Sequence, residues 1–129
     1  LTEAIRFDMY EKTIDLLRAA EHNEFEEFDV VYKEFGDVAL EEGFDRIGHV
    51  FHMIADVEKT HGDRFGIFAN LLESSRLFAA EEDTEWICLN CGYIYEGKIA
   101  PKYCPVCEHE QGYFIRLEQA PYANLRESC

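Results

Sequence analysis

The sequence predicts a mainly α protein, in which a hairpin of two long helices precedes a small β domain built around a metal held by cysteines. Three observations support this fold class. Apolar residues recur at steps of three and four over most of the first 75 residues, as they do on the buried face of an amphipathic helix. All three prolines lie beyond residue 100, so neither helix is interrupted. Four of the five cysteines fall between residues 88 and 107.

The first helix is expected from about Phe7 to Leu40, which corresponds to about ten turns if the helix is unbroken. Its apolar residues are spaced so that they form one stripe along the helix. The stripe consists of Phe7, Tyr10, Ile14, Leu17, Ala20, Phe28, Val31, Phe35 and Val38.

A second helix is expected after a turn at Gly43. Residues 1–75 are therefore predicted to form an αα-hairpin. A two-helix hairpin cannot bury its own stripes, so it needs a partner surface. The second stripe consists of Ile47, Phe51, Ile54, Phe65, Phe68 and Leu72.

The pattern changes after the second helix. Residues 76–85 are expected to be a linker, because the helical spacing breaks down in ESSRLFAAEEDTE. Residues 86–117 are rich in glycine, proline and aromatic residues, and the short alternating pieces YIYEG and YFIRL suit small strands. The tail, residues 118–129, carries no pattern, and no structure is predicted for it.

The charge of the chain limits its partners. A formal net charge of -15, from 12 basic and 27 acidic residues, argues against nucleic acid and anionic membranes, because phosphate binding depends on clustered Lys and Arg. No segment is long and apolar enough to span a bilayer, and LTEAIRFDMYEK lacks the features of a signal peptide. A cytoplasmic location is therefore expected, with neither nucleic acid nor membrane as a partner.

The four clustered cysteines predict a metal site. Cys88, Cys91, Cys104 and Cys107 form two Cys-x-x-Cys pairs separated by twelve residues, and two such turns complete a tetrahedral thiolate cage. Zinc in this cage would only hold a small fold together, whereas iron would carry one electron. The spacing alone leaves both readings open. Cys129 has no partner in this scheme.

The helices carry a second candidate site. Glu58 and His61 are three residues apart, so they leave the same helix face one turn apart, and the apolar stripe places that face inward. Glu24 and Glu27 repeat this arrangement on the first helix. Several buried carboxylates repel one another, and bound cations would neutralise them. The alternative is that each residue lies at the edge of the stripe in solvent. His22, His49 and His52 are expected to be exposed.

Both segments resemble one protein family. CLNCGYIYEGKIAPKYCPVC, with aromatic residues at Trp86 and Phe114, resembles a rubredoxin domain in the shortened form found in rubrerythrins, in which the metal is iron. ALEEGFDRIGHVFHMIADVEKTHGDRF and EFEEFDVVYKEF resemble the last two helices of the rubrerythrin bundle. Glu108 departs from the pattern, because free-standing rubredoxins usually place glycine there. A less regular second turn that still binds metal is expected.

The resemblance implies roles for the helical residues. Glu58 would bridge two irons, His61 and Glu24 would be terminal ligands, and Glu27 would bind one iron in the oxidised state. Tyr32 would donate a hydrogen bond to a carboxylate outside the ligand set. The implied cofactors are a carboxylate-bridged non-haem di-iron centre and a four-cysteine iron, for which zinc can substitute.

The resemblance also implies a function and an architecture. The fold would be half of a ferritin-like four-helix bundle, completed by a second chain in a homodimer, unless the sequence is a fragment that lacks an N-terminal half. The activity would be that of a peroxidase that reduces hydrogen peroxide, with an NAD(P)H-dependent reductase or a rubredoxin as electron donor. Two alternatives are an iron-oxidising, iron-handling protein and a non-enzymatic zinc-ribbon interaction module.

Overall fold

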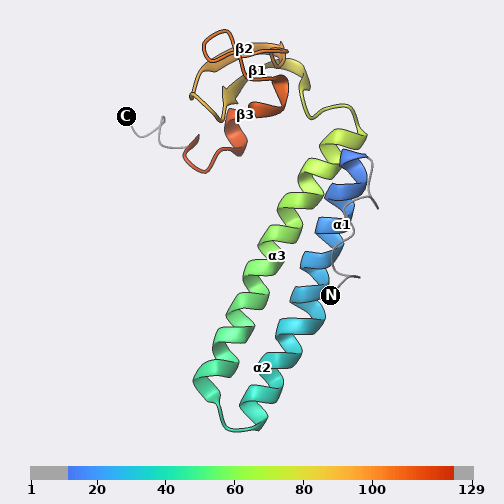
Figure 1. The fold of residues 1–129 in the computed structure, drawn as a ribbon, viewed down its shortest axis with the longest axis vertical. Helices are drawn as coiled ribbons and strands as arrows, with labels where there is room; N and C mark the ends of the chain where they lie inside the picture. Colours follow the sequence, from blue (N-terminus) through green and yellow to red (C-terminus); the bar gives the residue numbers. More distant parts are fainter. Residues whose placement is uncertain (1–11, 124–129) are drawn as a thin grey trace. The chain divides into compact units, whose positions relative to one another are not determined.

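The computed structural model describes residues 12–123 and divides the chain into two compact units, one running up to Glu73 and the other starting at Ser74. The first unit is the predicted helical hairpin (Figure 1). Its elements are α1 (Thr13–Glu26), a π-helical turn η1 (Glu27–Val31), α2 (Tyr32–Glu41) and α3 (Asp45–Glu73). The predicted start near Phe7 lies outside the described residues. The turn at Gly43 is confirmed, with a φ of 88° that glycine adopts readily.

The two arms of the hairpin approach closely where glycine replaces a side chain. A Cβ on Gly36 would lie 2.2 Å from Cδ2 of His52, and one on Gly48 would lie 2.9 Å from the carbonyl oxygen of Gly36. The backbones of α2 and α3 therefore meet at this point with no room for a methyl group. Close packing of this kind fixes which residues of the two arms face each other.

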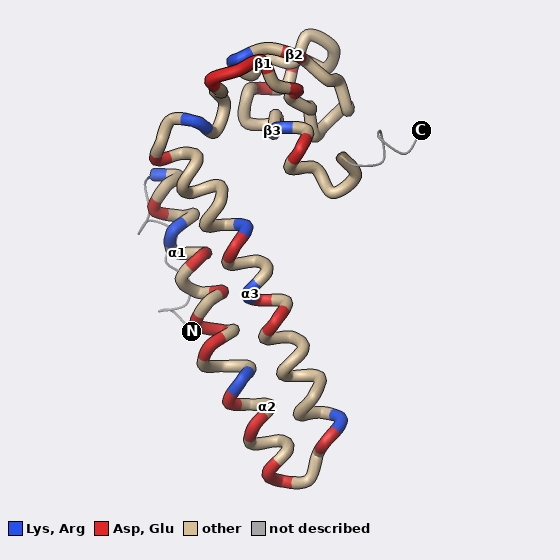
Figure 2. Tube along the Cα trace, turned by 180° about the vertical axis from the view of Figure 1, so that it is seen from behind, with Lys and Arg blue, Asp and Glu red and all other residues tan. Residues whose placement is uncertain are grey.

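The hairpin leaves most of its apolar surface uncovered, as the sequence predicts. The buried residues of α2 and α3 are glycines and alanines only, and α1 has none. Charged residues lie along both arms as well (Figure 2). A stable helix pair normally buries its stripe, so this surface is available for packing against another element. The exposed large apolar residues of the hairpin are Leu16, Val30, Phe35, Val38, Phe44, Ile47, Val50, Met53, Val57 and Ile67.

The second unit is a three-stranded antiparallel sheet with the strand order β2-β1-β3. Its strands are β1 (Ala79–Cys88), β2 (Ile94–Ile99) and β3 (Phe114–Arg116). Its core contains Trp86 and Phe114, which are 0% and 1% exposed, together with Cys88 and Cys104. The pieces YIYEG and YFIRL overlap β2 and β3, as predicted.

Two differences from the sequence analysis concern this unit. β1 begins at Ala79, inside the stretch expected to be linker, and a register shift between Ala79 and Thr84 separates its first pairing from the rest. The beginning of the tail is also ordered, since a 3-10 turn η3 (Leu117–Gln119) packs Leu117 and Ala120 against Ile87. Another 3-10 turn, η2 (Gln111–Tyr113), precedes β3. Cys129 lies outside the described residues.

The helices of this structure differ from membrane-spanning helices. Within residues 12–123, none has the combination of length and apolar character that crossing a bilayer needs.

Candidate metal centres

The hairpin brings three predicted ligands together. Glu24 comes from α1 and Glu58 and His61 from α3, and one ligand atom of each lies within 4.8 Å of the other two. Nδ1 of His61 lies 3.0 Å from Oε2 of Glu58 and 3.6 Å from Oε2 of Glu24. The i, i+3 spacing on α3 therefore places Glu58 and His61 on one face, opposite Glu24, as the helical geometry requires.

The carboxylates of this cluster are poorly solvated. The side chains of Glu58 and Glu24 are 15% and 20% exposed, against 40% for His61. Oε2 of Glu24 is buried and accepts no hydrogen bond. Burial raises the pKa of Glu24 above its ordinary value, and the neighbouring Glu58 carboxyl raises it further. A buried carboxylate oxygen without a donor is unfavourable, and a divalent cation would satisfy it. The donor set therefore fits a metal.

Glu27 lies outside this group of three. It is half-buried and is the first residue of the π-helical turn η1. Its charge acts on Glu24, whose pKa it raises. A π turn holds one residue more than an α turn and is often found at functional sites. This turn could not be predicted from the sequence, because EFDVV contains none of the glycine or proline residues that mark irregular helices. The role of Glu27 as a ligand stays a prediction.

Tyr32 follows the π turn and packs among aromatic rings. Its ring stacks on Phe51, with the centroids 6.1 Å apart, and meets Phe35 edge-on at 6.2 Å. Within residues 12–123, its hydroxyl does not make the predicted hydrogen bond to a carboxylate. Its role beside the ligands therefore stays a prediction.

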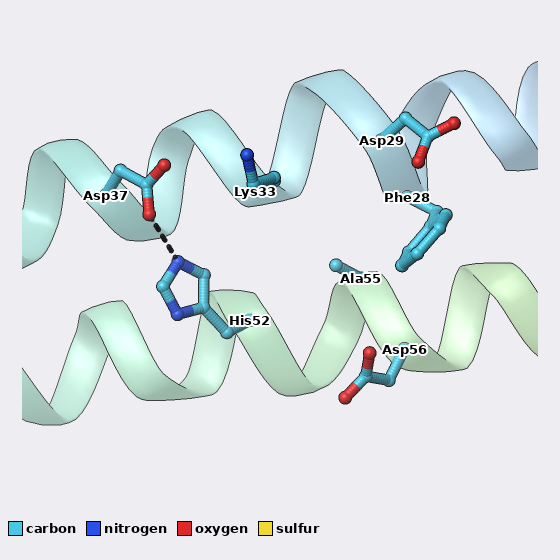
Figure 3. Close-up of a pocket in the computed structure, with 7 residues that line it drawn as sticks. All are labelled: Phe28, Asp29, Lys33, Asp37, His52, Ala55 and Asp56. Carbon is cyan, nitrogen blue, oxygen red and sulfur yellow. Dashed lines mark hydrogen bonds and ion pairs between the residues drawn. The ribbon is translucent and has the colours of Figure 1, made fainter.

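The expectation for the other helical histidines is correct for His22 and His49 but wrong for His52. His22 is 79% exposed beside Glu26, and His49 is exposed. His52 is half-buried, and its Nε2 lies 2.9 Å from Oδ1 of Asp37 (Figure 3). The ring fills the space that Gly36 leaves open on the opposite helix, which a single-helix projection cannot reveal. The pair borders a surface pocket of about 420 Å³ lined by Phe28, Asp29, Lys33, Asp37, His52, Ala55 and Asp56.

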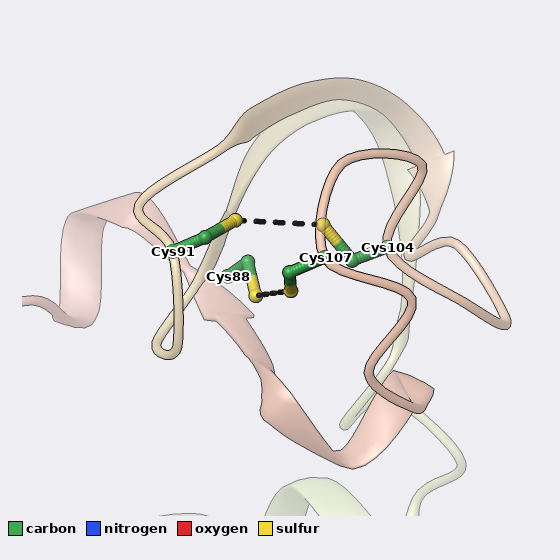
Figure 4. Close-up of side chains that lie close together, drawn as sticks. All are labelled: Cys88, Cys91, Cys104 and Cys107. Carbon is green, nitrogen blue, oxygen red and sulfur yellow. Dashed lines mark hydrogen bonds between the residues drawn. The ribbon is translucent and has the colours of Figure 1, made fainter.

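The second unit brings the four predicted cysteines together (Figure 4). Their sulfur atoms lie within 4.8 Å of one another, with 3.7 Å between Cys88 and Cys107 and 3.6 Å between Cys91 and Cys104. Cys88 and Cys104 are buried, Cys107 is half-buried and Cys91 is exposed. The first cysteine of each pair therefore anchors the site in the core, while the second lies nearer the surface.

The two cysteine turns have the same backbone geometry. The N–H of Gly92 donates to the carbonyl of Cys88 at 2.8 Å, and the N–H of Glu108 donates to that of Cys104 at 2.9 Å. Both residues have positive φ, 84° at Gly92 and 65° at Glu108. The expected irregularity at Glu108 therefore does not open the second turn, which keeps the hydrogen bond of the first.

Backbone donors around the sulfurs favour thiolates. The pKa of Cys107 is lowered to about 6, chiefly because its sulfur accepts a hydrogen bond from the backbone N–H of His109. The N–H of Tyr93 also acts to lower the pKa of Cys91, but desolvation and the three neighbouring sulfurs outweigh it and raise this pKa to about 12. Adjacent thiols thus resist ionising together, and a cation in the cage would remove that repulsion.

Comparisons with known proteins find relatives of this chain. A family model described as "Rubrerythrin, rubredoxin-like domain" matches residues 86–115. Rubrerythrin-1 of Clostridium acetobutylicum is 43% identical over 103 residues, which are 80% of this chain and 53% of that protein. Rubrerythrin of Nitratidesulfovibrio vulgaris is 43% identical over 99 residues, which are 77% of this chain and 50% of that protein.

Solved structures of nigerythrin are also similar. The partially reduced form is 25% identical with a TM-score of 0.49, over 87% of this chain and 52% of that chain. The chain spans about half the length of the curated relatives it matches. The family model covers the four-cysteine segment, and each unit of the structure brings together side chains that could hold a metal ion. The chain therefore belongs to the rubrerythrin family of iron proteins.

Proposed function

We propose that this chain forms half of a non-haem di-iron peroxidase that reduces hydrogen peroxide to water with electrons passed through its four-cysteine site. The observation that carries the proposal is the orphaned Oε2 of Glu24, buried beside Glu58 and His61. A carboxylate and a Glu-x-x-His pair from two helices are the known ligands of di-iron sites in helical bundles. The same chain also carries a cage suited to an electron-carrying iron.

Four helical residues would bind the two ions. Glu58 would bridge the two ions, and Glu24 and His61 would each be a terminal ligand of one. Glu27 would join one ion in the oxidised state. These residues supply the negative charge that balances the cations in a poorly solvated site. Bound there, two iron ions would supply two electrons to peroxide, which with two protons gives two molecules of water.

The four cysteines would hold the iron that restores those electrons. Cys88 and Cys104 fix the cage in the core, while the exposed Cys91 lies where an external donor can approach. An NAD(P)H-dependent reductase or a rubredoxin would serve as that donor. We place the protein in the cytoplasm, where a reducing environment keeps such thiols available for metal.

The hairpin requires a second half to complete the site. Three ligand residues cannot saturate two ions, and the apolar surface of the hairpin is uncovered. We propose that a second copy, related by a two-fold axis, supplies the same residues again and covers the apolar stripe. An N-terminal half in a longer chain would meet the same need. The solution mass and the iron content per chain distinguish the two arrangements.

The peroxidase reaction can be followed by the colour of the four-cysteine iron. The iron-loaded protein is reduced without oxygen and then mixed with hydrogen peroxide. We expect the colour of the oxidised site to return within seconds, and to return at least about tenfold more slowly in Glu58→Ala. Glu26→Ala, which removes an exposed acid from α1, should behave as the wild type does.

Other outcomes would support the other functions. Equal rates in Glu58→Ala and wild type would refute the peroxidase proposal. Uptake and oxidation of ferrous iron with no preference for peroxide would indicate an iron-handling protein. A colourless protein with one zinc per chain, which takes up no iron on anaerobic reconstitution, would indicate a structural zinc ribbon.

A further inference from the structure

The core of the cysteine unit contains a buried arginine. Arg116 of β3 is 7% exposed and pairs across the sheet with Trp86 of β1. Two residues along, Phe114 pairs with Cys88. Residues directly opposite each other in an antiparallel pair lie on the same face of the sheet, as do alternate residues of one strand. Arg116 therefore lies on the face of the sheet that carries the first cysteine of the cage.

The guanidinium of Arg116 packs on an aromatic ring from the same core. Its central carbon lies 5.1 Å from the centroid of the Trp86 ring. Nε1 of Trp86 donates to the carbonyl oxygen of Gly97 at 2.8 Å, which fixes the ring in place. Trp86 is 0% exposed and belongs to one buried cluster with Cys88 and Cys104. The positive charge and the sulfur cage thus share a core with little water to screen one from the other.

The charge of Arg116 is only partly satisfied. Its Nη2 donates to the carbonyl oxygens of Arg76 and Ala79 at 2.8 and 2.7 Å, and these two acceptors carry no net charge. Its Nε is buried and has no hydrogen-bond partner. Burying a cation with an unmet donor is costly unless negative charge lies nearby. An anionic metal cage in the same core would supply that negative charge.

We propose that the buried charge of Arg116 stabilises the reduced form of the four-cysteine iron and so raises its reduction potential. Four thiolates around ferric iron carry one net negative charge, and one electron from the donor converts the iron to the ferrous state and adds a second. The step forms and breaks no bond and needs no proton. A fixed positive charge in the same core favours the form with the greater negative charge.

The size of this effect follows from Coulomb's law. At a separation of about 10 Å and an effective dielectric constant of about 20, one buried charge changes the ratio of the two forms by about tenfold. Exposed charges act more weakly, because water and salt screen them over about 10 Å at 0.1 M salt. Arg116 should therefore influence the iron more than an exposed lysine of the same unit, such as Lys98, does.

A raised potential has a consequence for the proposed function. The four-cysteine iron would accept an electron more readily and hold it until peroxide arrives. Peroxide is a strong oxidant, so the electron can still pass onward. This inference rests on one part of the proposed function, the presence of iron in the cage, and it does not depend on the reduction of peroxide.

The potential is measured on the iron-loaded full chain by redox titration with soluble mediators, without peroxide. At a fixed applied potential, we expect the ratio of reduced to oxidised iron in Arg116→Met to be about tenfold lower than in wild type, a fall of about 59 mV for a one-electron couple. Arg116→Lys keeps the charge and should stay close to wild type. Lys98→Met removes an exposed charge and should change the ratio by less than about twofold, a change that high salt abolishes.

A role of Arg116 in the fold alone predicts a different result. It would lower the iron content or the thermal stability of Arg116→Met but leave the potential of the iron-loaded fraction unchanged, which would overturn the proposal. An equal fall in Arg116→Lys would overturn it too, because shape and not charge would then be responsible. Arg116→Gln is a second neutral variant and should show the same fall as Arg116→Met. If neither neutral variant holds iron, Arg116 is needed for the fold itself and the proposal fails.

Failure of the proposed function is read separately. A wild type that reduces no peroxide refutes the peroxidase, and the potential still decides the role of Arg116. If the cage takes up zinc but no iron, the electron relay fails, and zinc affinity tests the charge instead, because zinc with four thiolates has the net charge of the ferrous form. Competition with a chelator should then show binding at least about tenfold weaker in Arg116→Met but not in Arg116→Lys. Equal affinities in the two variants and wild type would overturn the proposal.

Discussion

Gly92 and Glu108 occupy equivalent positions after the two cysteine pairs, and both have a left-handed backbone, with φ of 84° and 65°. Glycine adopts this conformation without strain, whereas an L residue with a side chain is disfavoured there by roughly 1–2 kcal/mol. The hydrogen bond from the N–H of Glu108 to Cys104 holds the residue in place. The second cysteine turn is therefore formed with a strain that the first turn avoids.

Glu108→Gly should stabilise the cysteine unit. The relieved strain exceeds the extra chain entropy of glycine, which is about 0.5–1 kcal/mol, so a gain of up to about 1 kcal/mol is expected. Denaturant unfolding of the zinc-loaded protein, followed by the fluorescence of the single tryptophan, Trp86, measures it. Glu108→Ala removes the same charge but keeps a Cβ. An equal gain in Glu108→Ala would show that charge, and not backbone strain, is responsible.

Much of the candidate site could be predicted because its determinants are local. Each cysteine pair closes within one turn, and Glu58 and His61 share a face through helical geometry alone. The start of β1 could not be predicted in this way. Ala79 pairs with Ile99, twenty residues further on, and acidic residues and a register shift separate this pairing from the rest of the strand. Nothing in the local pattern of AAEEDTE indicates that pairing.

The half-buried position of the His52 side chain could not be predicted from its own helix. Its ring occupies the space beside Gly36, which carries no side chain, and its Nε2 lies close to Oδ1 of Asp37, the residue after Gly36 on the opposite helix. A helical projection places residues on a face but does not identify what the neighbouring helix presents there. The π turn at Glu27–Val31 is a similar case, because its residues have ordinary helical preferences.

Gly36→Ala should destabilise the hairpin. Alanine is intrinsically better in a helix by about 1 kcal/mol, but its Cβ would lie 2.2 Å from Cδ2 of His52 and 3.0 Å from the carbonyl oxygen of Gly48. Overpacking of this kind usually costs about 1–3 kcal/mol, so the clash should outweigh the helix preference. Far-UV circular dichroism against denaturant, at one fixed protein concentration, measures the loss.

A double variant separates the two clashes of Gly36→Ala. Adding His52→Ala removes the ring but leaves the carbonyl of Gly48 in place, so it should restore only part of the stability. A single Gly36→Ala protein as stable as the wild type would contradict the close approach of α2 and α3.

Removal of the metal should leave Cys107 and Cys91 with very different reactivities. At pH 7 Cys107, with a pKa of about 6, is mostly thiolate, whereas Cys91, with a pKa of about 12, is almost entirely protonated. Since the thiolate is the nucleophile, brief treatment of the metal-free protein with iodoacetamide should modify Cys107 before Cys91. Peptide mass mapping identifies the site. Cys91 is the more exposed of the two. Its preferential modification would show that exposure, and not the thiol pKa, decides which cysteine reacts, and would contradict this prediction.

The metal-free hairpin should become less stable as the pH rises, because of Glu24. Burial raises the pKa of this residue in the folded state above the ordinary value of 4.5. In the unfolded chain, Glu24 therefore loses its proton at a lower pH than in the folded protein. The contribution of protonated Glu24 to stability is fully present below about pH 4.5 and is lost as the pH rises through the folded-state pKa. Glu24→Gln cannot ionise and should lack this loss, which makes it more stable than wild type at pH 7 when both are free of metal.

The same variant should bind metal more weakly, because a carboxamide oxygen replaces a charged ligand at the buried position. Thermal unfolding of metal-free wild type and Glu24→Gln between pH 4.5 and 7 tests the stability part, and iron titration tests the binding part. Glu26→Gln, at an exposed position on the same helix, should keep the wild-type dependence on pH. A metal-free Glu24→Gln protein less stable than wild type at pH 7 would mean that the Glu24 carboxylate is well solvated, and the site would then have no unmet need for a cation.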